Sequence, residues 1–431
     1  MTRAGTPPPE TLVETLRAQL PQGARDALDR ILRAGGTSAV YAAGGSVRDL
    51  LLGRHAIDLD LVVEGDAPSI AREALQGARV TTHVRFGTAT ATVSGVRFDL
   101  VRARRESYPR PAALPRVAPG SIADDLRRRD FTVNAMALRL DGTPVLLDPC
   151  GGLADLDARL IRVLHDRSFI DDPTRIYRAF RYAARLDFTV EPETATLIRD
   201  ALRYVDALSG DRLRREIELL LGDAPAGRAL EAAQAAGALQ AAHPALHWSP
   251  EKSRAYVADV VAEGEREAYG FGLLASTASI DEAELVVERL RLRRAESATV
   301  TGVAALRGVT QMLQRPEVRP SGVAMLLDRY PAPAIAAYAM TTGSGVAREL
   351  ALRYLSAWRG QRARLRGRDL IAMGVPPGPQ VERGLQLVRA ARLDGWANDL
   401  EDERALIARF ARSIHDASVA NAPLEFEPRG E

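Results

Sequence analysis

The sequence of 431 residues is poor in the residues that form disulfides, histidine metal sites and lysine-dependent phosphate sites. Cys150 is its only cysteine, which excludes an internal disulfide and fits a cytoplasmic chain. The six histidines show no metal-ligand spacing and no Gly-Lys pair is present, so neither a zinc site nor a P-loop is predicted. No stretch is apolar enough to cross a membrane, and we expect no membrane partner.

The remaining composition is typical of a soluble globular protein, with 46% hydrophobic and 26% charged residues and a formal net charge of +2. Lys252 is the only lysine, so arginine carries almost all of the positive charge. Arginine binds phosphate bidentately and stacks on bases, although a genomic base-composition bias explains the same preference more simply. The length allows two to four domains, and residues 1–9 lack a signal-peptide core and are expected to form a flexible lead-in.

Three aspartates stand in segments that have the pattern of β-strands. In the run Asp58-Leu59-Asp60-Leu61, alternation puts Asp58 and Asp60 on one face of a strand. Asp99 lies on the second strand of an expected hairpin that turns at Ser94-Gly95, and this places it in the same sheet. Carboxylates so close together repel one another and need cations between them, and an oxygen cage suits Mg²⁺. The pattern therefore predicts a two-metal phosphoryl or nucleotidyl transferase.

A glycine turn precedes the aspartate strand. Residues 38–43 read as a strand, Gly44-Gly45-Ser46 as a tight turn, and the next residues as a short helix that Gly53 closes. Two glycines let the backbone approach an anion, the start of the helix presents free N–H groups, and Ser46 adds a hydroxyl. We expect this turn to hold the β- and γ-phosphates of a triphosphate. Arg48 would support the turn or an ion, and an ion pair on the helix surface is equally consistent with its position.

Further motifs follow in order at residues 128–137, 171–182 and, more weakly, 209–216. With the glycine turn and the aspartate strand, they make the chain resemble the class II tRNA nucleotidyltransferase (CCA-adding enzyme) and bacterial poly(A) polymerase family, within the polymerase-β-like nucleotidyltransferase superfamily. The resemblance extends from about residue 38 to about residue 220. We expect an α+β nucleotidyltransferase head, with a mixed sheet and flanking helices, followed by an all-α neck, body and tail.

The resemblance implies two Mg²⁺ ions held by Asp58 and Asp60, one polarising the 3′-hydroxyl of the primer and the other gripping the triphosphate. Asp99 would ligate the first ion and help to deprotonate the hydroxyl. The alternative is an exposed acidic pair beside an unrelated strand aspartate. The family residues that meet the nucleotide's phosphate and ribose, or that order the site, match Arg129, Asp130 and Asn134.

The third motif contains a possible reader of the nucleobase. If Asp172 and Arg175 lie on a helix, they project side by side. The carboxylate can accept from the exocyclic amine of cytosine or adenine and the guanidinium can donate to the ring acceptors, so this pair would fit C and A and misfit G and U. An ion pair at a helix start is the alternative. The family usually has Glu-Asp where this chain has Asp171-Asp172, and Arg178 and Arg181 would brace the pair or touch phosphate.

Strands and helices alternate up to about Asp148, and nearly all of the later sequence has helical spacing, including an expected helix over residues 156–163. The segment Tyr108–Gly120 contains four prolines and is expected to be a mobile loop. We expect a division into a lead-in with helices (1–36), the catalytic head (37–150), a neck with the base-reading segment (151–222), and a helical body and tail that bind RNA (223–431).

The expected activity is template-independent addition of C and/or A residues, from CTP and ATP, to the acceptor end of tRNA. Complete CCA addition, CC-only and A-only addition all remain open, and the oligomeric state is not predicted. The loop over residues 105–120 is where relatives that stop after CC differ. A late run, Gly367–Pro379, resembles a tail segment that contacts tRNA, and a helix ending in a Pro/Gly loop is the alternative.

Two other functions compete with this interpretation. A poly(A) polymerase shares the head motifs, but bacterial members of that branch tend to have a more basic segment where this chain has His55-Ala56-Ile57, which favours the tRNA enzyme. A catalytically silent RNA-binding protein on the same scaffold would have lost its metal-binding carboxylates, whereas Asp58, Asp60 and Asp99 are all present.

Overall fold

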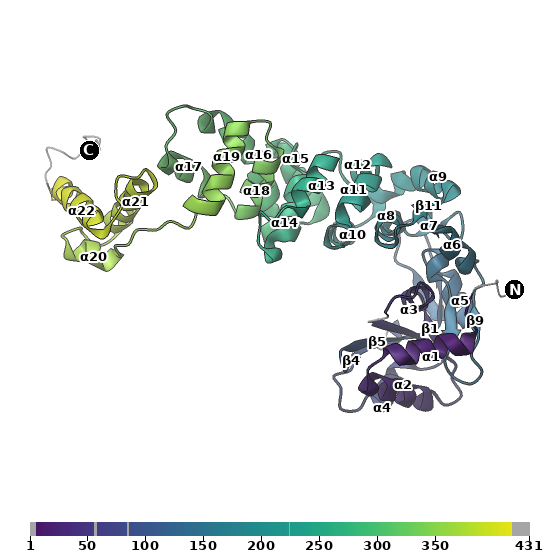
Figure 1. Cartoon of the computed structure of the whole chain (residues 1–431). Helices are drawn as coiled ribbons and strands as arrows, with labels where there is room; N and C mark the ends of the chain where they lie inside the picture. The colour runs from purple at the N-terminus through teal and green to yellow at the C-terminus, as the bar shows by residue number, and fades with distance from the viewer. Residues whose placement is uncertain (1–5, 56–57, 84–85, 224, 416–431) are drawn as a thin grey trace. The chain divides into compact units, whose positions relative to one another are not determined.

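The computed structural model describes residues 6–55, 58–83, 86–223 and 225–415. The chain forms two compact units, Met1–Ala242 and His243–Glu431, and each is described by itself. Figure 1 shows strands only in the first unit, while helices make up the second. Within the described residues, no helix has both the length and the apolar character needed to span a membrane.

The first unit is built on a seven-stranded mixed sheet with the order β3-β4-β5-β2-β1-β8-β9. Strands β2 and β5 run parallel, and the other neighbouring strands are antiparallel. This arrangement confirms the expected mixed sheet. The strands are β1 (Val40–Ala43), β2 (Asp58–Val63), β3 (Thr81–His83), β4 (Thr88–Val93), β5 (Val96–Arg102), β8 (Ala137–Arg139) and β9 (Leu146–Leu147).

The two faces of this sheet pack against different helices. Helices α1 (Pro9–Gln19), α2 (Gln22–Gly35) and α4 (Ala67–Ala74) lie together on one side (Figure 1), where Leu59 and Leu61 join their apolar side chains in the larger core. On the other face, Val62 packs with residues of α5 (Ile122–Arg127). Alternation along β2 places Asp58 and Asp60 on this second face, so the core leaves the aspartates free for chemistry.

The expected hairpin at Ser94-Gly95 is confirmed, and so is a second one that alternation over residues 136–140 and 144–147 also predicts. Strands β4 and β5 pair up to Val93 and Val96, and both turn residues have positive φ, 50° at Ser94 and 80° at Gly95. Positive φ at both central residues is typical of a type I′ turn, whose backbone twist matches the twist of the two strands that it joins. Strands β8 and β9 form the second hairpin.

The segment expected to be a loop contains a strand. β6 (Arg104–Ser107) pairs antiparallel with β7 (Arg116–Pro119) in a separate two-stranded sheet, with Arg104 opposite Pro119. The prediction of a loop over Tyr108–Gly120 is therefore wrong for its last third. Proline is tolerated at the end of an edge strand, where its missing N–H is not needed, so the four prolines did not exclude a strand.

The neck is mostly helical, with one correction. The helix expected over residues 156–163 ends early, because α6 (Gly152–Ala158) stops before Arg159, whose φ is +55°. β10 (Leu160–Ile161) follows and pairs in parallel with β11 (Thr189–Val190), in keeping with the strand preference of β-branched residues. The remaining elements are η2 (Thr132–Asn134), α7 (Ser168–Asp171), α8 (Thr174–Leu186), α9 (Pro192–Ala201), η3 (Leu202–Ala207), α10 (Gly210–Gly222), α11 (Ala226–Ala235) and α12 (Ala238–Ala242).

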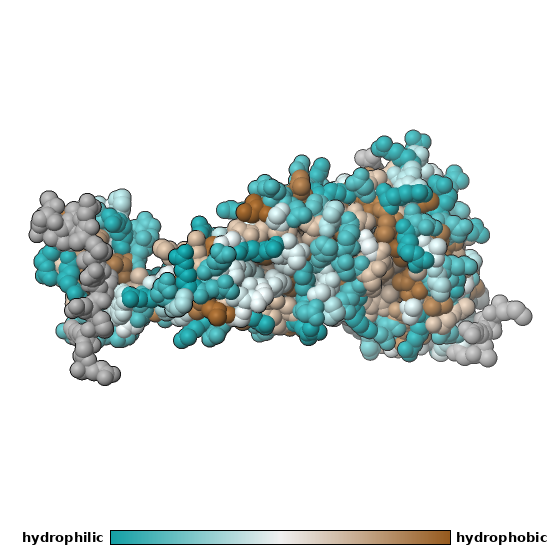
Figure 2. All heavy atoms as spheres, turned by 90° about the horizontal axis from the view of Figure 1, so that it is seen from above, coloured by the Kyte–Doolittle hydropathy of each residue, from teal (hydrophilic) through white to brown (hydrophobic). Residues whose placement is uncertain are grey.

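The second unit is all helical in its described part. In the view of Figure 2, hydrophilic side chains cover much of the visible surface of this unit, and hydrophobic residues form separate patches on it. Its elements are α13 (Pro250–Val257), η4 (Glu263–Glu265), α14 (Arg266–Leu274), α15 (Ile280–Leu290), α16 (Arg294–Leu313), α17 (Pro320–Leu327), α18 (Ala332–Thr341), α19 (Gly345–Arg353), η5 (Tyr354–Trp358), α20 (Gly367–Ala372), α21 (Pro379–Leu393) and α22 (Leu400–His415).

The last three helices share a small core of their own that includes Leu370, Val388 and Ile407. The run Gly367–Pro379 consists of α20, a turn in which Gly374 has a φ of +92°, and the start of α21. This is the helix ending in a Pro/Gly loop that the sequence offered as the alternative, and contact of this segment with tRNA stays a prediction. The expected division into four parts also stays a prediction.

Candidate active site

Strand register brings the three aspartates onto one face of the sheet. Strand β2 pairs in parallel with β5 so that Asp60 lies directly opposite Asp99, and Asp58 lies opposite Arg97. Residues opposite each other on neighbouring strands point the same way, and neighbouring strands lie about 4.8 Å apart. Asp58, Asp60 and Asp99 therefore line one patch of the sheet. The hairpin pattern had placed Asp99 in this sheet, and the register adds that it shares a face with the other two.

The carboxylates of this patch repel one another. Burial raises the pKa of Asp60, and the charges of Asp99 and Asp58 raise it further, against the opposing charge of Arg129. Asp99 is less isolated, because it accepts a hydrogen bond from Thr90 Oγ1 at 2.5 Å and pairs with Arg97 Nε at 2.8 Å. Within the ranges that the structure covers, no group of three or more Asp, Glu, His or Cys side chains is arranged so that it could hold a metal ion as it stands.

The residues present nevertheless fit a divalent cation. A raised pKa at Asp60 means that the ionised carboxylate has too little positive charge around it, and a bound cation would supply that charge. All three side chains offer carboxylate oxygens, which are the ligands that Mg²⁺ prefers. Asp99 would have to exchange its contact with Arg97 for the ion.

The glycine turn fixes the approach of helix α3 (Gly45–Leu51) to the aspartate strand. Gly44 has a φ of +71°, which strains any residue with a Cβ, and a Cβ there would also displace Arg129 Nη1, which would lie 2.1 Å away. Ser46 Oγ donates to the backbone carbonyl of Asp58 at 3.1 Å and accepts from the backbone N–H of Asp60 at 2.9 Å. The Ser46 hydroxyl, which the sequence assigned to a phosphate, thus ties the helix to the strand and holds the two aspartates in place.

Arg48 is buried, with 2% of its surface exposed, so the alternative of a surface ion pair is wrong. Its guanidinium pairs bidentately with Asp49, at 2.9 Å from both Nε and Nη2, and its Nη1 donates to Asn134 Oδ1. It also lies over the ring of Tyr182, 5.5 Å from the centroid. Arg48 therefore links the glycine-turn helix to the second and third motifs.

Asp130 is the central hydrogen-bond acceptor of the second motif. It accepts hydrogen bonds from Asn134 Nδ2 at 3.0 Å, from the Phe131 N–H at 2.9 Å and from Arg178 Nε at 2.9 Å. Burial alone would raise the pKa of Asp130, but the charge of Arg178 and these hydrogen bonds outweigh it and hold the pKa at about 2. Asp130 is ionised at neutral pH, and it fixes the positions of Asn134 and Arg178.

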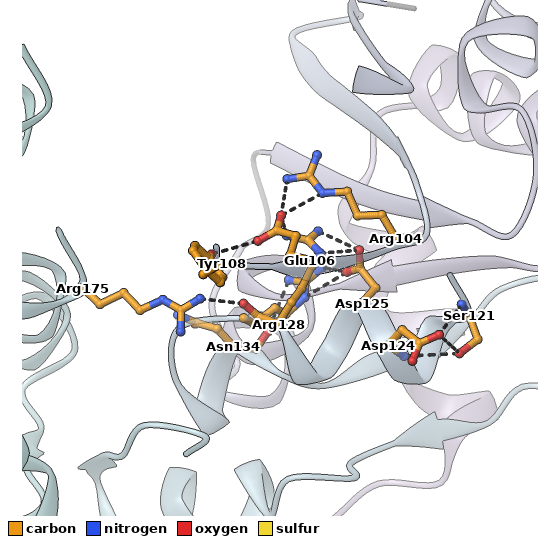
Figure 3. A network of polar contacts seen from close by, with 10 residues as sticks. Arg104, Glu106, Tyr108, Ser121, Asp124, Asp125, Arg128, Asn134 and Arg175 are labelled. Atoms are coloured by element: carbon orange, nitrogen blue, oxygen red, sulfur yellow. Dashed lines mark hydrogen bonds and ion pairs between the residues drawn. The ribbon is translucent and has the colours of Figure 1, made fainter. Parts of the chain in front are cut away.

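A second polar network orients the arginines of this motif (Figure 3). Asp125, which is completely buried, pairs with Arg128 Nη2 at 2.6 Å and with Arg129 Nη2 at 3.1 Å. Arg128 also reaches Glu106 at 3.2 Å, and Tyr108 donates its hydroxyl to the same carboxylate at 3.0 Å. Sequence reasoning gave no role to Asp125, Glu106 or Tyr108. The spacing of Asp125 from the two arginines, i+3 and i+4 on a helix, is the one signal that pointed to it.

The expected side-by-side pair on a helix is wrong. Asp172 has an extended backbone, with φ −139° and ψ 93°, and α8 begins only at Thr174. A residue that precedes proline disfavours helical geometry, and Pro173 follows Asp172. Asp172 forms an ion pair with Arg212 Nη2 at 2.7 Å, and Arg175 Nη2 donates to the Arg128 carbonyl at 2.8 Å.

One cavity nevertheless contains eight of the thirteen predicted site residues in its wall. It has a volume of about 410 Å³. A neighbouring cavity of about 340 Å³ is lined by Ser46, Arg48 and Asp58, and it shares Gly45, Asp60 and Tyr182 with the first. Tyr182 lies in the third motif and was given no role, and Asp99 lines neither of these two cavities. The predicted residues on the wall of the first cavity are Gly45, Asp60, Arg129, Asp130, Asn134, Asp172, Arg175 and Arg178.

An aspartate pair on a mixed sheet, a glycine turn beside it and a cavity lined by arginines define the class of a polymerase-β-like nucleotidyltransferase. Residues 40–162 match the family model of the poly A polymerase head domain, and residues 187–248 match that of a probable RNA- and SrmB-binding site of polymerase A. The chain belongs to the tRNA nucleotidyltransferase and bacterial poly(A) polymerase family. Enzymes of this kind generally use divalent metal ions.

Named relatives support this membership. The chain is 36% identical over 405 residues to the CC-adding tRNA nucleotidyltransferase of Deinococcus radiodurans, covering 92% of this chain and 96% of that protein. It is 35% identical over 399 residues to the A-adding tRNA nucleotidyltransferase of Geobacter sulfurreducens, covering 87% of this chain but only 45% of that longer protein. The Thermotoga maritima CCA-adding enzyme complexed with tRNA superposes with a TM-score of 0.74 at 28% identity, covering 94% of this chain and 98% of that one.

Proposed function

We propose that this protein is a template-independent tRNA nucleotidyltransferase that adds C and/or A residues to the tRNA 3′ end from CTP and ATP and releases pyrophosphate. The observation that carries the proposal is a single cavity lined both by Asp60 of the aspartate pair and by the candidate base readers Asp172 and Arg175. The relatives that add CC, A or CCA to tRNA support the same substrates.

Asp58, Asp60 and Asp99 are the proposed ligands of two Mg²⁺ ions, which when bound would polarise the primer 3′-hydroxyl and neutralise the triphosphate. The primer oxygen attacks the α-phosphorus, a new P–O bond forms, and the bond to the pyrophosphate breaks. Asp99 accepts the hydroxyl proton in this proposal. Holding the three carboxylates on one face before substrate arrives reduces the reorganisation needed during the reaction.

The nucleotide's phosphates are proposed to lie against the glycine turn. The backbone of Gly44 and Gly45 would allow an anion to approach closely, and the start of α3 would present N–H groups to it. Arg129 lies beside Gly44 and adds a positive charge. Asp130, Asn134 and Arg178 form the adjoining cavity wall, where the ribose would lie.

Base selection is assigned to Asp172 and Arg175. The Nη1 of Arg175 is buried and has no hydrogen-bond partner among the described residues, so a donor stands ready for a ring acceptor of the base. A carboxylate accepts from the amine of C or A but offers nothing to the carbonyl that G or U presents at the same place. Arginines of the second unit would then bind the phosphates of the tRNA acceptor end, and this binding would weaken as the salt concentration rises. These substrates suggest a cytoplasmic enzyme.

Incorporation assays on defined primers test the proposal. Purified protein and Mg²⁺ are incubated with tRNA ending at the discriminator base, at C or at CC, with CTP and ATP supplied separately. We expect addition of no more than three nucleotides, with the primer that is extended identifying CC-only, A-only or complete CCA addition. The matched control is the same tRNA already ending in CCA, which should not be extended.

Two other outcomes would contradict the proposal. A long A tail on unrelated RNA would identify a poly(A) polymerase, the main alternative for this head domain. No incorporation with any primer or nucleotide would support the silent RNA-binding scaffold. The segment at residues 55–57, on which the sequence argument against a poly(A) polymerase depends, includes Ala56 and Ile57, which lie outside the described residues.

A further inference from the structure

Arg212 of α10 connects two parts of the molecule that are far apart in the sequence. Its Nη2 donates to Asp172 Oδ1 at 2.7 Å, and its Nη1 donates to the backbone carbonyl of Ala112 at 2.8 Å. Asp172 lies on the wall of the nucleotide cavity, and Ala112 lies in the connection between β6 and β7. One guanidinium therefore joins the proposed base reader to the tip of the hairpin.

The two carboxylate oxygens of Asp172 have different surroundings. Oδ1 accepts from Arg212, from the Thr174 N–H at 3.1 Å and from Thr174 Oγ1 at 2.6 Å. Three donors at one oxygen occupy its acceptor capacity and fix the rotation of the carboxylate. Oδ2 then remains as the acceptor for an exocyclic amine of C or A. Without Arg212, only the two donors of Thr174 would hold Oδ1, and the carboxylate would be less firmly oriented.

The hairpin tip is docked rather than loosely placed. Ala112 is 7% exposed, its N–H donates to the Ile170 carbonyl at 3.1 Å, and its carbonyl accepts from Arg212. Its φ of +58° is a conformation that a residue with a Cβ rarely adopts, so tertiary contacts must hold it. The carbonyl of Ala112 in turn keeps the Arg212 guanidinium in the orientation that reaches Asp172.

We propose that Arg212 is a positioning residue that sets nucleotide selectivity, by holding Asp172 so that only one carboxylate oxygen faces the base. Arg212 lines neither of the two cavities of the active site, so it acts through Asp172. The inference rests on the proposed function, because Asp172 reads a base only if the cavity binds a nucleotide. Arg212 belongs to the weakly matching fourth motif, residues 209–216, and this motif would then contribute to nucleotide selectivity.

Arg212→Ala, Arg212→Lys and the matched control Arg215→Ala test this role in the full-length protein. Arg215 is on the same helix, has 65% of its side chain exposed and pairs with Glu218 outside the cavity. Two quantities are measured: equilibrium binding of CTP, ATP, UTP and GTP without primer, and kcat and KM for each nucleotide with the tRNA primer. Thermal melting verifies that each variant is folded.

For Arg212→Ala we expect the preference for the cognate nucleotide over UTP to fall about tenfold, mainly through a higher KM for the cognate nucleotide. Arg212→Lys keeps the charge but cannot donate to both Ala112 and Asp172 in a planar fork, so it should restore only part of the preference. Arg215→Ala should match the wild type. If Arg212→Ala does not fold, the partial loss expected for Arg212→Lys carries the test.

The proposal is overturned if Arg212→Ala and Arg212→Lys retain the wild-type ratios, or if they lower binding and turnover of all four nucleotides in equal proportion. The binding measurement separates this failure from that of the proposed function. Suppose that the wild type transfers no nucleotide but binds CTP or ATP selectively, and that Arg212→Ala loses this selectivity. That result would contradict the proposed function and support the inference. A wild type that binds all four nucleotides alike, or binds none, overturns the inference.

Discussion

Replacing Asp60 by asparagine is expected to lower kcat for nucleotide addition by about 10³-fold or more while the protein stays folded. Asparagine has nearly the same shape, but it removes the negative charge at the carboxylate whose pKa is raised by burial and by Asp99 and Asp58. Because this pKa is raised in the folded protein, the ionised Asp60 destabilises the fold at pH 7, above its unfolded pKa. The melting temperature of Asp60→Asn should therefore equal or exceed that of the wild type.

The control is Asp200→Asn, at an exposed position at the end of α9, which should change neither quantity. Primer extension with labelled CTP or ATP gives kcat, and a thermal melt gives the stability. Loss of activity together with a lower melting temperature would mean that Asp60 supports the fold. Retention of more than about a tenth of the activity would exclude it as an essential metal ligand.

Replacing Arg178 by alanine is expected to destabilise the first unit by about 3 kcal/mol and to abolish nucleotide binding. The substitution leaves Asp130, which is 8% exposed, as an unpaired buried charge beside Asn134. The value is at the low end for a buried pair, since the Arg178 side chain keeps 31% of its exposure. Denaturant-dependent hydrogen exchange of α8 amides measures the effect locally, which matters because two compact units need not unfold together.

The pH dependence of this effect has a defined sign. The pKa of Asp130 is about 2 in the fold, below its value in the unfolded chain. The stabilisation by the pair is thus fully present above about pH 4 and is lost as the pH falls toward 2. The difference between wild type and Arg178→Ala should be largest at neutral pH and shrink in acid.

The matched control is Arg228→Ala, which breaks an ion pair with Asp187 in which both side chains are mostly exposed. Exposed pairs contribute only about 0–1 kcal/mol, so this variant should unfold nearly like the wild type. Equal destabilisation by the two substitutions would show that the Asp130–Arg178 contact has no special importance.

The local features of the site could be predicted from the sequence. The alternation of Asp58 and Asp60 with leucines was enough to place both on one face of a strand, and the Ser94-Gly95 hairpin placed Asp99 in the same sheet. The parallel pairing that sets Asp99 opposite Asp60 is known only from the structure. The tight turn at Gly44 was likewise expected, and the structure shows the positive φ that makes glycine necessary there. These features depend on neighbours in the chain, which the sequence displays.

The features that were missed depend on contacts between distant residues. Arg212 lies 40 residues from Asp172 and 100 residues from Ala112, and no local pattern links them. The error at Asp172 has a local cause, because helical spacing was extended across Pro173 although the residue before a proline disfavours the helix. Burial of Arg48 was also unforeseen, since a charged residue on a short helix usually faces solvent.

The most direct test of the account is to locate divalent ions in crystals of the wild-type protein grown with Mn²⁺ and a non-hydrolysable analogue of CTP or ATP. We expect anomalous peaks about 2.2 Å from carboxylate oxygens of Asp58, Asp60 and Asp99, next to the triphosphate. Peaks only elsewhere, or an Asp99 that stays paired with Arg97 and touches no ion, would contradict the claim that these three aspartates form the catalytic centre.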